Sequence, residues 1–332
     1  PSGYIADVFG RRKTIIFSTI FSFMGYVVFS FYSGFFAFAL AQVLVGIGGS
    51  LISGSDSALI YDTLLDQGEE EYYTKIEGRS YAVGNFSESI AGILGGLLAV
   101  SSICLPVYVQ TIIMFFSIPI AISLEEPKVA QENNMGRSIK AIFSVIRFVI
   151  IDNLKLRWLI IYSSAMGVAT LSIAWFAQPF FKEISLPLFY FGFLWSALNF
   201  SAGITSFNSH FFNSFFKNSN SFLYLGVAMF LSIILIGFNI SFFGLFFIFS
   251  VYLLRGIVTP VLKNNININT DSDKRATVLS IRSFIIRISF AISAPIIAFI
   301  AESFSLASAF LSLGIFLGFF LFLASYKLSR LI

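Results

Sequence analysis

Five ionisable residues lie inside otherwise apolar runs of this sequence, namely Asp56, Glu88, Arg255, Arg282 and Arg287. If these runs cross a lipid bilayer, each charge is costly, with about 2.5–3.5 kcal/mol as the lower estimate for Arg, Lys or Asp at a helix centre. The five side chains must therefore face protein or water. Carboxylates and guanidinium groups at such positions can form ion pairs, and protonation of the carboxylate weakens such a pair.

The sequence offers few residues for catalysis, metal binding or nucleotide binding. The sequence contains a single histidine, His210, and a single cysteine, Cys104, which excludes His-pair metal sites, thiolate clusters and a disulfide framework. It also lacks the G-x-x-x-x-G-K-[ST] loop that binds nucleotide phosphates. We therefore expect no catalytic residues, no metal and no cofactor, so that any transport must run on an ion or substrate gradient.

The composition predicts a membrane protein. Hydrophobic residues make up 57% and charged residues 11% of the 332 positions, whereas soluble domains carry about 25% charge. Backbone polar groups in lipid must be paired within a helix or a closed barrel. The apolar runs are near 20 residues long rather than about 10, which favours helices over barrel strands. The fold class is therefore an all-α membrane protein.

The apolar runs predict ten membrane-spanning helices, at residues 14–33, 35–62, 79–102, 104–124, 158–181, 188–209, 221–239, 241–262, 276–300 and 304–326. Threading them from an inside start at Arg11 puts most lysines and arginines into the inner loops, and only Lys182 into the outer ones. Lys and Arg are enriched in cytoplasmic loops. The net charge of +4 is thus a topology signal, and we expect no binding of nucleic acid.

The first residues carry the most specific pattern, G-x-x-x-D-x-x-G-R-R-K, formed by Gly3, Asp7, Gly10, Arg11, Arg12 and Lys13. This string resembles the signature loop between helices two and three of the major facilitator superfamily of secondary transporters. The resemblance implies two similar six-helix bundles with a binding site between them near the midplane. In family numbering the predicted segments are helices three to twelve, and we expect helix one and most of helix two to be missing before Pro1.

The predicted domains are an incomplete bundle at 1–124, a linker at 125–157 on the cytoplasmic side, and a six-helix bundle at 158–332. Within the linker, apolar residues recur at helical spacing over residues 138–156, with Lys140, Arg147 and Lys155 elsewhere on the helix. This pattern predicts an amphipathic helix on the cytoplasmic membrane surface. A simple linker is the alternative.

The resemblance also implies roles at the cytoplasmic gate. Asp7 is expected to contact Arg11 and the start of the helix near Ala276, where a carboxylate is favoured by the positive helix end. The five intramembrane charges lie about 9–18 Å from the predicted cytoplasmic ends. We expect Asp56 and Glu88 to pair with arginines across the closed gate. Pairs fixed within one bundle, or arginines bonded to carbonyls, are the alternatives.

Polar and aromatic residues near the midplane are the candidates for the substrate cavity. They are Asn85, Trp175, Gln178, Trp195, Asn199 and Tyr252. Several share a helix face with one another or with an intramembrane charge, because they are three or four positions apart. Each has the alternative role of a packing residue or an interhelical hydrogen bond.

The sequence therefore predicts a secondary active transporter of the major facilitator type, a monomer in the inner (plasma) membrane that works by alternating access. We expect coupling to protons and export of small amphipathic or drug-like molecules, because the interior has few fixed charges and many aromatics. A proton-coupled importer of a sugar or another metabolite is the close alternative. A non-transporting receptor or scaffold and a membrane-embedded enzyme are the alternatives from other classes. The expected partners are a small-molecule substrate, protons and the lipid bilayer.

Overall fold

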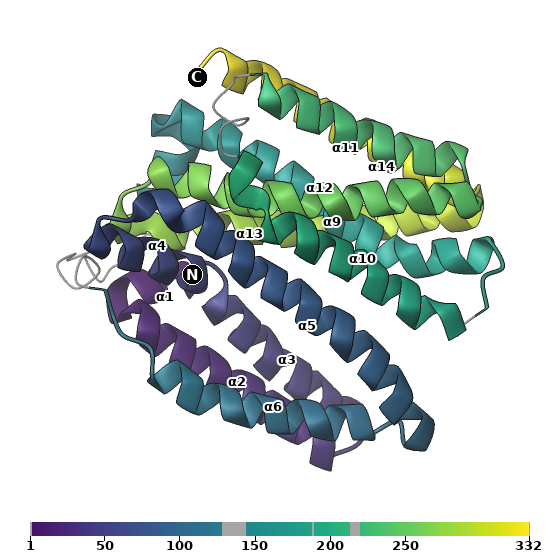
Figure 1. Ribbon diagram of the computed structural model, residues 1–332, viewed down its shortest axis with the longest axis horizontal. Coiled ribbons are helices and arrows are strands. Elements are labelled where there is room, and N and C mark those ends of the chain that lie inside the picture. The colour runs from purple at the N-terminus through teal and green to yellow at the C-terminus, as the bar shows by residue number, and fades with distance from the viewer. Residues whose placement is uncertain (1, 128–143, 188, 213–219, 332) are drawn as a thin grey trace. The chain divides into compact units, whose positions relative to one another are not determined.

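The computed structural model describes residues 2–127, 144–187, 189–212 and 220–331, and every regular element in these ranges is a helix (Figure 1). The predicted all-α fold class is confirmed. The long helices are α2 (Arg11–Phe31), α3 (Phe35–Ile52), α5 (Tyr73–Ser101), α6 (Leu105–Ile122), α9 (Leu154–Glu183), α10 (Phe189–Phe207), α11 (Ser221–Phe238), α12 (Phe242–Ile268), α13 (Arg275–Ser303) and α14 (Leu306–Ser329). Two shorter α-helices are α1 (Ser2–Phe9) and α4 (Ser55–Gln67).

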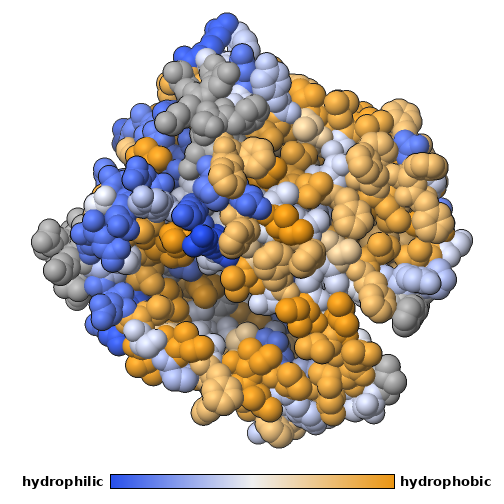
Figure 2. All heavy atoms as spheres, viewed as in Figure 1, coloured by the Kyte–Doolittle hydropathy of each residue, from blue (hydrophilic) through white to orange (hydrophobic). Residues whose placement is uncertain are grey.

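Nine helical stretches of the described residues are long and apolar enough to cross a membrane. Helix α10 lies in the remaining predicted segment at 188–209 and is not one of these nine. Large apolar side chains are widely exposed, such as Phe36 and Phe243. Hydrophobic residues accordingly cover much of the surface drawn in Figure 2. Such a surface suits lipid rather than water.

The predicted helix at 35–62 is wrong in one respect, because the structure divides it into α3 and α4 at Gly54. Gly54 has a φ of +89°, a conformation that favours glycine. A Cβ at this position would lie 3.0 Å from the Ala276 carbonyl oxygen, so the break lets the first turn of α13 approach. The Ser280 hydroxyl donates a hydrogen bond of 2.8 Å to the carbonyl oxygen of Ser53, next to the break.

The chain forms two compact units that do not follow its linear order. Unit 1 contains Pro1–Tyr73, Leu94–Asp152 and Asn267–Ser283, and unit 2 contains Thr74–Ile93, Asn153–Ile266 and Phe284–Ile332. Most of α5, Thr74–Ile93, thus packs in unit 2, and the first turns of α13 pack in unit 1. The predicted division into an incomplete bundle at 1–124, a linker at 125–157 and a six-helix bundle at 158–332 stays a prediction.

The core of unit 1 is built on α2, which packs against α3 and α6. Small residues allow the approach of α3: the Ser18 hydroxyl donates to the Gly48 carbonyl oxygen at 2.8 Å, and a Cβ on Gly48 would lie 2.8 Å from the Ser18 carbonyl oxygen. Small residues at helix crossings are how membrane helices pack closely. About one turn before Ser18 on α2, Ile15 forms a buried cluster with Leu59 and Ala121.

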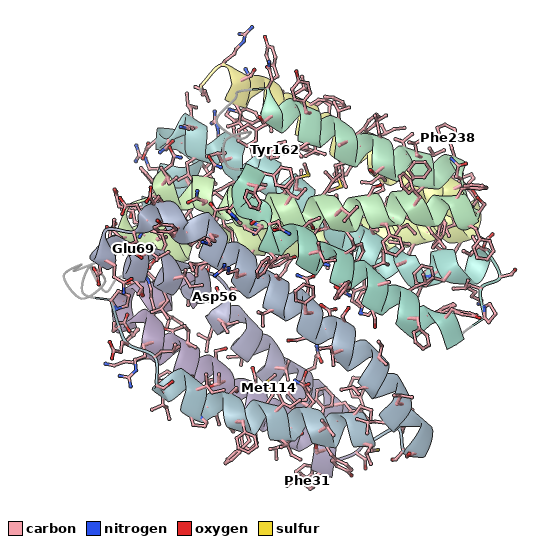
Figure 3. The ribbon with its side chains drawn as sticks, viewed as in Figure 1. Phe31, Asp56, Glu69, Met114, Tyr162 and Phe238 are labelled. Atoms are coloured by element: carbon pink, nitrogen blue, oxygen red, sulfur yellow. The ribbon has the colours of Figure 1, made fainter. Side chains whose placement is uncertain are left out.

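The core of unit 2 is aromatic. Phe180 and Phe310 are fully buried with ring centroids 6.2 Å apart, where α9 meets α14. Tyr162 of α9 (labelled in Figure 3) packs edge-on against Phe222 of α11 and donates to its carbonyl oxygen at 2.8 Å. These contacts fix α9, α11 and α14 as one packed group.

The predicted surface helix at 138–156 lies partly outside the described residues, which exclude 128–143. Residues 144–147 are helical, and Phe148–Asp152 continue as a π-helix. Val145 and Val149 are buried and Arg147 is exposed, so this part is amphipathic. Its position on a membrane surface stays a prediction.

Candidate functional site

The turn between α1 and α2 depends on Gly10 and Glu126. Gly10 precedes α2 with a φ of +98°, and a Cβ there would lie 3.1 Å from Oε2 of Glu126. The Glu126 carboxylate accepts hydrogen bonds from the backbone N–H groups of Arg11 (2.7 Å) and Arg12 (2.8 Å). A carboxylate at this place satisfies free N–H groups of the helix and complements its positive end. Arg12 also donates to the Ile122 carbonyl oxygen at 2.7 Å, which ties the turn to α6.

Asp7, in α1 with Gly3, lies at the N-terminus of α13. Its buried carboxylate accepts hydrogen bonds from the Thr277 backbone N–H (2.8 Å), the Thr277 hydroxyl (2.6 Å) and the Ala276 backbone N–H (3.3 Å). Arg11 lies 3.7 Å away, so the structure contains both contacts that the resemblance implies. Asp7 precedes the first candidate span, Arg11–Phe31. Burial raises its pKa to about 7, although Arg11 and the hydrogen bonds of Thr277 act in the opposite direction.

Asp62 lies at the centre of a buried charge cluster in unit 1. Its carboxylate forms ion pairs with both Arg11 and Arg275, and the three side chains are at most 5% exposed. The hydroxyl of Ser272 donates to the same carboxylate at 2.7 Å. We call Asp7, Arg11, Asp62, Ser272, Arg275 and Thr277 the Asp62 cluster.

Further contacts hold both guanidinium groups of the Asp62 cluster in place. Arg11 donates to the carbonyl oxygens of Ala58 (3.1 Å) and Ser272 (2.7 Å). Arg275 donates to the Thr270 carbonyl oxygen at 2.9 Å, and its guanidinium carbon lies 4.2 Å from the ring centroid of Tyr61. Together these bonds join α2, α4 and the start of α13. Removing one partner from a buried pair of this kind typically costs about 3–5 kcal/mol, because a charge stays buried and unpaired.

Asp62 and Arg275 are functional candidates that the sequence interpretation missed, because they lie at the ends of the predicted segments 35–62 and 276–300 and not inside them. One signal was available for Arg275, which directly precedes Ala276, the expected partner of Asp7. The predicted Asp56 lies in the first turn of α4 with an exposed side chain (labelled in Figure 3). Arg282 is buried in the part of α13 that belongs to unit 1. Ion pairing of Asp56 across a gate stays a prediction.

A second cluster lies in unit 2 around Arg255. The Arg255 Nε donates to the Tyr81 hydroxyl at 2.7 Å, and the guanidinium carbon lies 5.7 Å and 5.4 Å from the ring centroids of Tyr81 and Tyr252. The Tyr252 ring meets Trp195 edge-on, with centroids 6.4 Å apart. Helices α5, α10 and α12 thus supply an arginine with aromatic walls, a favourable setting for a cation.

Three further polar residues belong to the same helices. Asn85 follows Tyr81 by one turn and donates to its carbonyl oxygen at 2.7 Å, and Asn199 does the same with Trp195 at 3.1 Å. Glu88 is exposed and close enough to attract Arg255, but no ion pair within 4 Å joins Glu88 to any described residue. We call Tyr81, Asn85, Glu88, Trp195, Asn199, Tyr252 and Arg255 the Arg255 cluster. All except Tyr81 were predicted as candidates from the sequence.

Small residues and a buried ion pair position the helices of this cluster. Ser89 and Ser196 exchange hydrogen bonds between their hydroxyls and each other's carbonyl oxygens, so α5 and α10 cross closely. Towards the start of α5, Glu77 pairs with Lys263 of α12 at 2.6 Å. These contacts set the spacing of the three helices on either side of Arg255.

The other predicted residues do not join the Arg255 cluster. Trp175 is 67% exposed and touches Phe290, with ring centroids 6.0 Å apart. Gln178 is exposed on the same helix, α9. Arg287 is exposed on α13, and no carboxylate of the described residues lies within ion-pair distance of it. A role of these three in a substrate cavity or in coupling stays a prediction.

Comparison with known proteins gives two findings. The sequence matches the Major Facilitator Superfamily over residues 1–272, and no curated protein matches it. The human organic anion transporter MFSD10 (TETRAN) has a similar structure, with a TM-score of 0.77 and 13% identity over 98% of this chain and 79% of that one. The fucose:proton symporter FucP of E. coli matches with a TM-score of 0.77 and 14% identity, over 98% of this chain and 86% of that one.

A structure of FucP in the outward conformation matches equally well, with a TM-score of 0.77 and 13% identity over 98% of this chain. At these identities the solved structures establish the fold alone. The family match covers most of the sequence and includes the G-x-x-x-D-x-x-G-R-R-K pattern, which contributes Asp7 and Arg11 to the Asp62 cluster. The chain is therefore a multi-pass membrane protein of a secondary-transporter family and belongs to the Major Facilitator Superfamily.

Proposed function

We propose that the chain is a proton-coupled transporter that works by alternating access and exports small amphipathic molecules from the cell. The observation that carries this proposal is the buried pairing of Asp62 with Arg11 and Arg275. It joins two helices from the start of the chain to a helix near its end. A contact of this kind stabilises one of two conformations if it forms in that conformation only.

In this proposal the Asp62 cluster is a latch on the cytoplasmic side of the inner membrane. The abundance of basic residues at the same ends of the helices supports this orientation. Opening would separate buried charges and return them to water, so the latch favours the closed state until substrate or proton binding offsets it. Gly10, Glu126 and Arg12 would keep the turn between α1 and α2 in place during this change.

Glu88 is the proposed proton-binding residue. It lies near the middle of α5, its carboxylate is exposed, and the charge of Arg255 acts on it. A proton on Glu88 would remove its attraction for Arg255 and so alter the contact between α5 and α12. FucP, which has a similar structure, is a fucose:proton symporter, and this supports proton coupling in this fold.

The experiment is solute flux in proteoliposomes under an imposed pH gradient. We expect accumulation driven by the gradient, its loss with a protonophore, and a flattened pH dependence in Glu88→Gln. The matched control is Glu183→Gln, which removes an exposed carboxylate at the end of α9. An unchanged pH dependence in Glu88→Gln would remove Glu88 from coupling. Whole-cell accumulation with and without a protonophore decides between export and the alternative of import.

A further inference from the structure

Arg255 lies at the middle of α12, thirteen positions from each end of Phe242–Ile268, or about 20 Å along the helix axis. Its Nε donates a hydrogen bond to the Tyr81 hydroxyl. No carboxylate of the described residues lies within 4 Å of the guanidinium. An arginine kept at membrane depth without a carboxylate partner is a candidate for recognising an external one, because its terminal N–H groups suit a carboxylate.

Two buried oxygen atoms without partners belong to the same cluster. They are the side-chain oxygens of Asn85 and Asn199. The assignment of the two amides is fixed, because each nitrogen donates to a carbonyl oxygen of its own helix. Buried polar atoms are usually paired, so these two oxygens call for a partner that can donate hydrogen bonds.

We infer that the Arg255 cluster binds a small organic acid, with its carboxylate on Arg255 and its hydroxyl or N–H groups on Asn85 and Asn199. The rings of Tyr81, Tyr252 and Trp195 would contact the apolar body of the same molecule. This inference rests on the proposed transport function and names its substrate class. It also relates Glu88 to substrate binding. Protonation of Glu88 removes the negative charge that competes with the acid for Arg255.

The test uses the purified full chain and three matched probes: mandelate, phenylacetate, which lacks the hydroxyl, and mandelamide, which lacks the charge. Binding is followed by thermal melting and by tryptophan fluorescence, since Trp195 belongs to the cluster. We expect both acids to bind, mandelate more tightly than phenylacetate, and mandelamide to bind at least about tenfold more weakly than mandelate. Equal binding of mandelate and mandelamide, or no binding of either acid, would overturn the inference.

Variants locate the binding. Arg255→Gln is expected to weaken mandelate binding at least about tenfold, whereas Arg330→Gln, which removes an exposed arginine at the end of α14, leaves it within about twofold. Tyr81→Phe removes the hydroxyl that positions Nε and should weaken mandelate binding several-fold without loss of folding. It serves as the second variant if Arg255→Gln does not fold. Unchanged affinity in the folded variants would overturn the inference.

Flux measurements separate this inference from the proposed function. Acids that bind through Arg255 without any solute crossing the membrane would contradict transport and leave the binding site in place. Gradient-driven movement of a neutral solute, with no binding of either acid, would leave transport in place and overturn the assignment of the substrate class.

Discussion

Arg275 and Asp62 form a buried ion pair although 213 positions separate them in the chain. The pair lies within unit 1, so the first turns of α13 belong to the same compact unit as α1, α2 and α4. The bond between Asp7 and the α13 N-terminus reinforces this arrangement at a second place. Both contacts lie where a helix begins or ends, and several helices are therefore held together at one place.

The first prediction concerns Asp62→Asn, which leaves Arg11 and Arg275 buried without their carboxylate. We expect a loss of about 3–5 kcal/mol in the stability of the latched state. A cysteine at Leu279, which is 2% exposed and contacts Gly54, reports opening. Its labelling rate in Leu279→Cys should rise at least about tenfold when Asp62→Asn is added. The exposed native Cys104 serves as the internal reference.

Asp66→Asn is the matched control for this experiment, because Asp66 is an exposed carboxylate one turn later on α4. It should leave both the labelling of Leu279→Cys and the melting temperature nearly unchanged, since surface charges contribute little. Equal labelling of the two asparagine variants would show that the Asp62 pairs do not hold α13 in place.

The second prediction concerns the pH dependence of the latch through Asp7. Its pKa is about 7 in the buried contact and 3.8 ordinarily. A carboxyl whose pKa is raised by burial binds a proton more readily in the latched state, so its stabilising effect is complete below 3.8 and is lost as the pH rises through 7. Labelling of Leu279→Cys relative to Cys104 should therefore be faster at about pH 8 than at about pH 5.

Asp7→Asn removes the titrating group while keeping a side chain of similar shape. In this variant the ratio of the two labelling rates should lose most of its change with pH. Persistence of the full change would assign the pH dependence to another group, and a rate that falls with rising pH would contradict the predicted sign.

The fold was largely predictable because lipid restricts the chain to helices, and the apolar runs mark where they lie. The predicted segments at 104–124 and 304–326 differ by only a few residues from α6 and α14. The break at Gly54 was missed although residues 53–57, Ser-Gly-Ser-Asp-Ser, interrupt the apolar run, because such residues are also tolerated inside a membrane helix. What produces the break is the approach of Ala276 and Ser280, and this contact is tertiary.

Candidate site residues were predictable where a polar side chain in an apolar run carries a free-energy cost. A charge or amide inside an apolar run has to be satisfied, and Asn85, Asn199 and Arg255 were found in this way. Asp62 and Arg275 were missed because a charge at the end of a membrane helix is expected to reach water at little free-energy cost. Only the folded chain shows that both are buried. Trp175 is exposed and lies outside the Arg255 cluster; an aromatic residue in a membrane helix suits lipid as well as a cavity, and its role in a cavity stays a prediction.

The third prediction concerns Gly54→Ala. Alanine would have to adopt a φ of +89° and would place its Cβ 3.0 Å from the Ala276 carbonyl oxygen. We expect a destabilisation of about 1–3 kcal/mol, measured as a lower melting temperature in detergent.

Gly49→Ala is the control, because Gly49 is in α3 and a Cβ there meets nothing within 4 Å. It should be neutral or slightly stabilising, by up to about 1 kcal/mol. Equal effects of the two would show that Gly54 is not needed for the approach of α13.

The fourth prediction concerns the pair of Glu77 and Lys263 in unit 2, whose side chains are 5% and 18% exposed. Lys263→Met leaves a buried carboxylate without its partner, and we expect a loss of about 3–5 kcal/mol, measured by melting. Adding Glu77→Leu removes that carboxylate, and replacement of a whole buried pair by apolar residues is often neutral or stabilising. The double variant should therefore recover most of the lost melting temperature.

If the double variant instead loses the sum of the two single losses in melting temperature, the side chains act independently and the pair does not set the spacing of α5 and α12. If it recovers but binds mandelate more weakly than the unmodified chain, the pair positions the Arg255 cluster as well as stabilising unit 2.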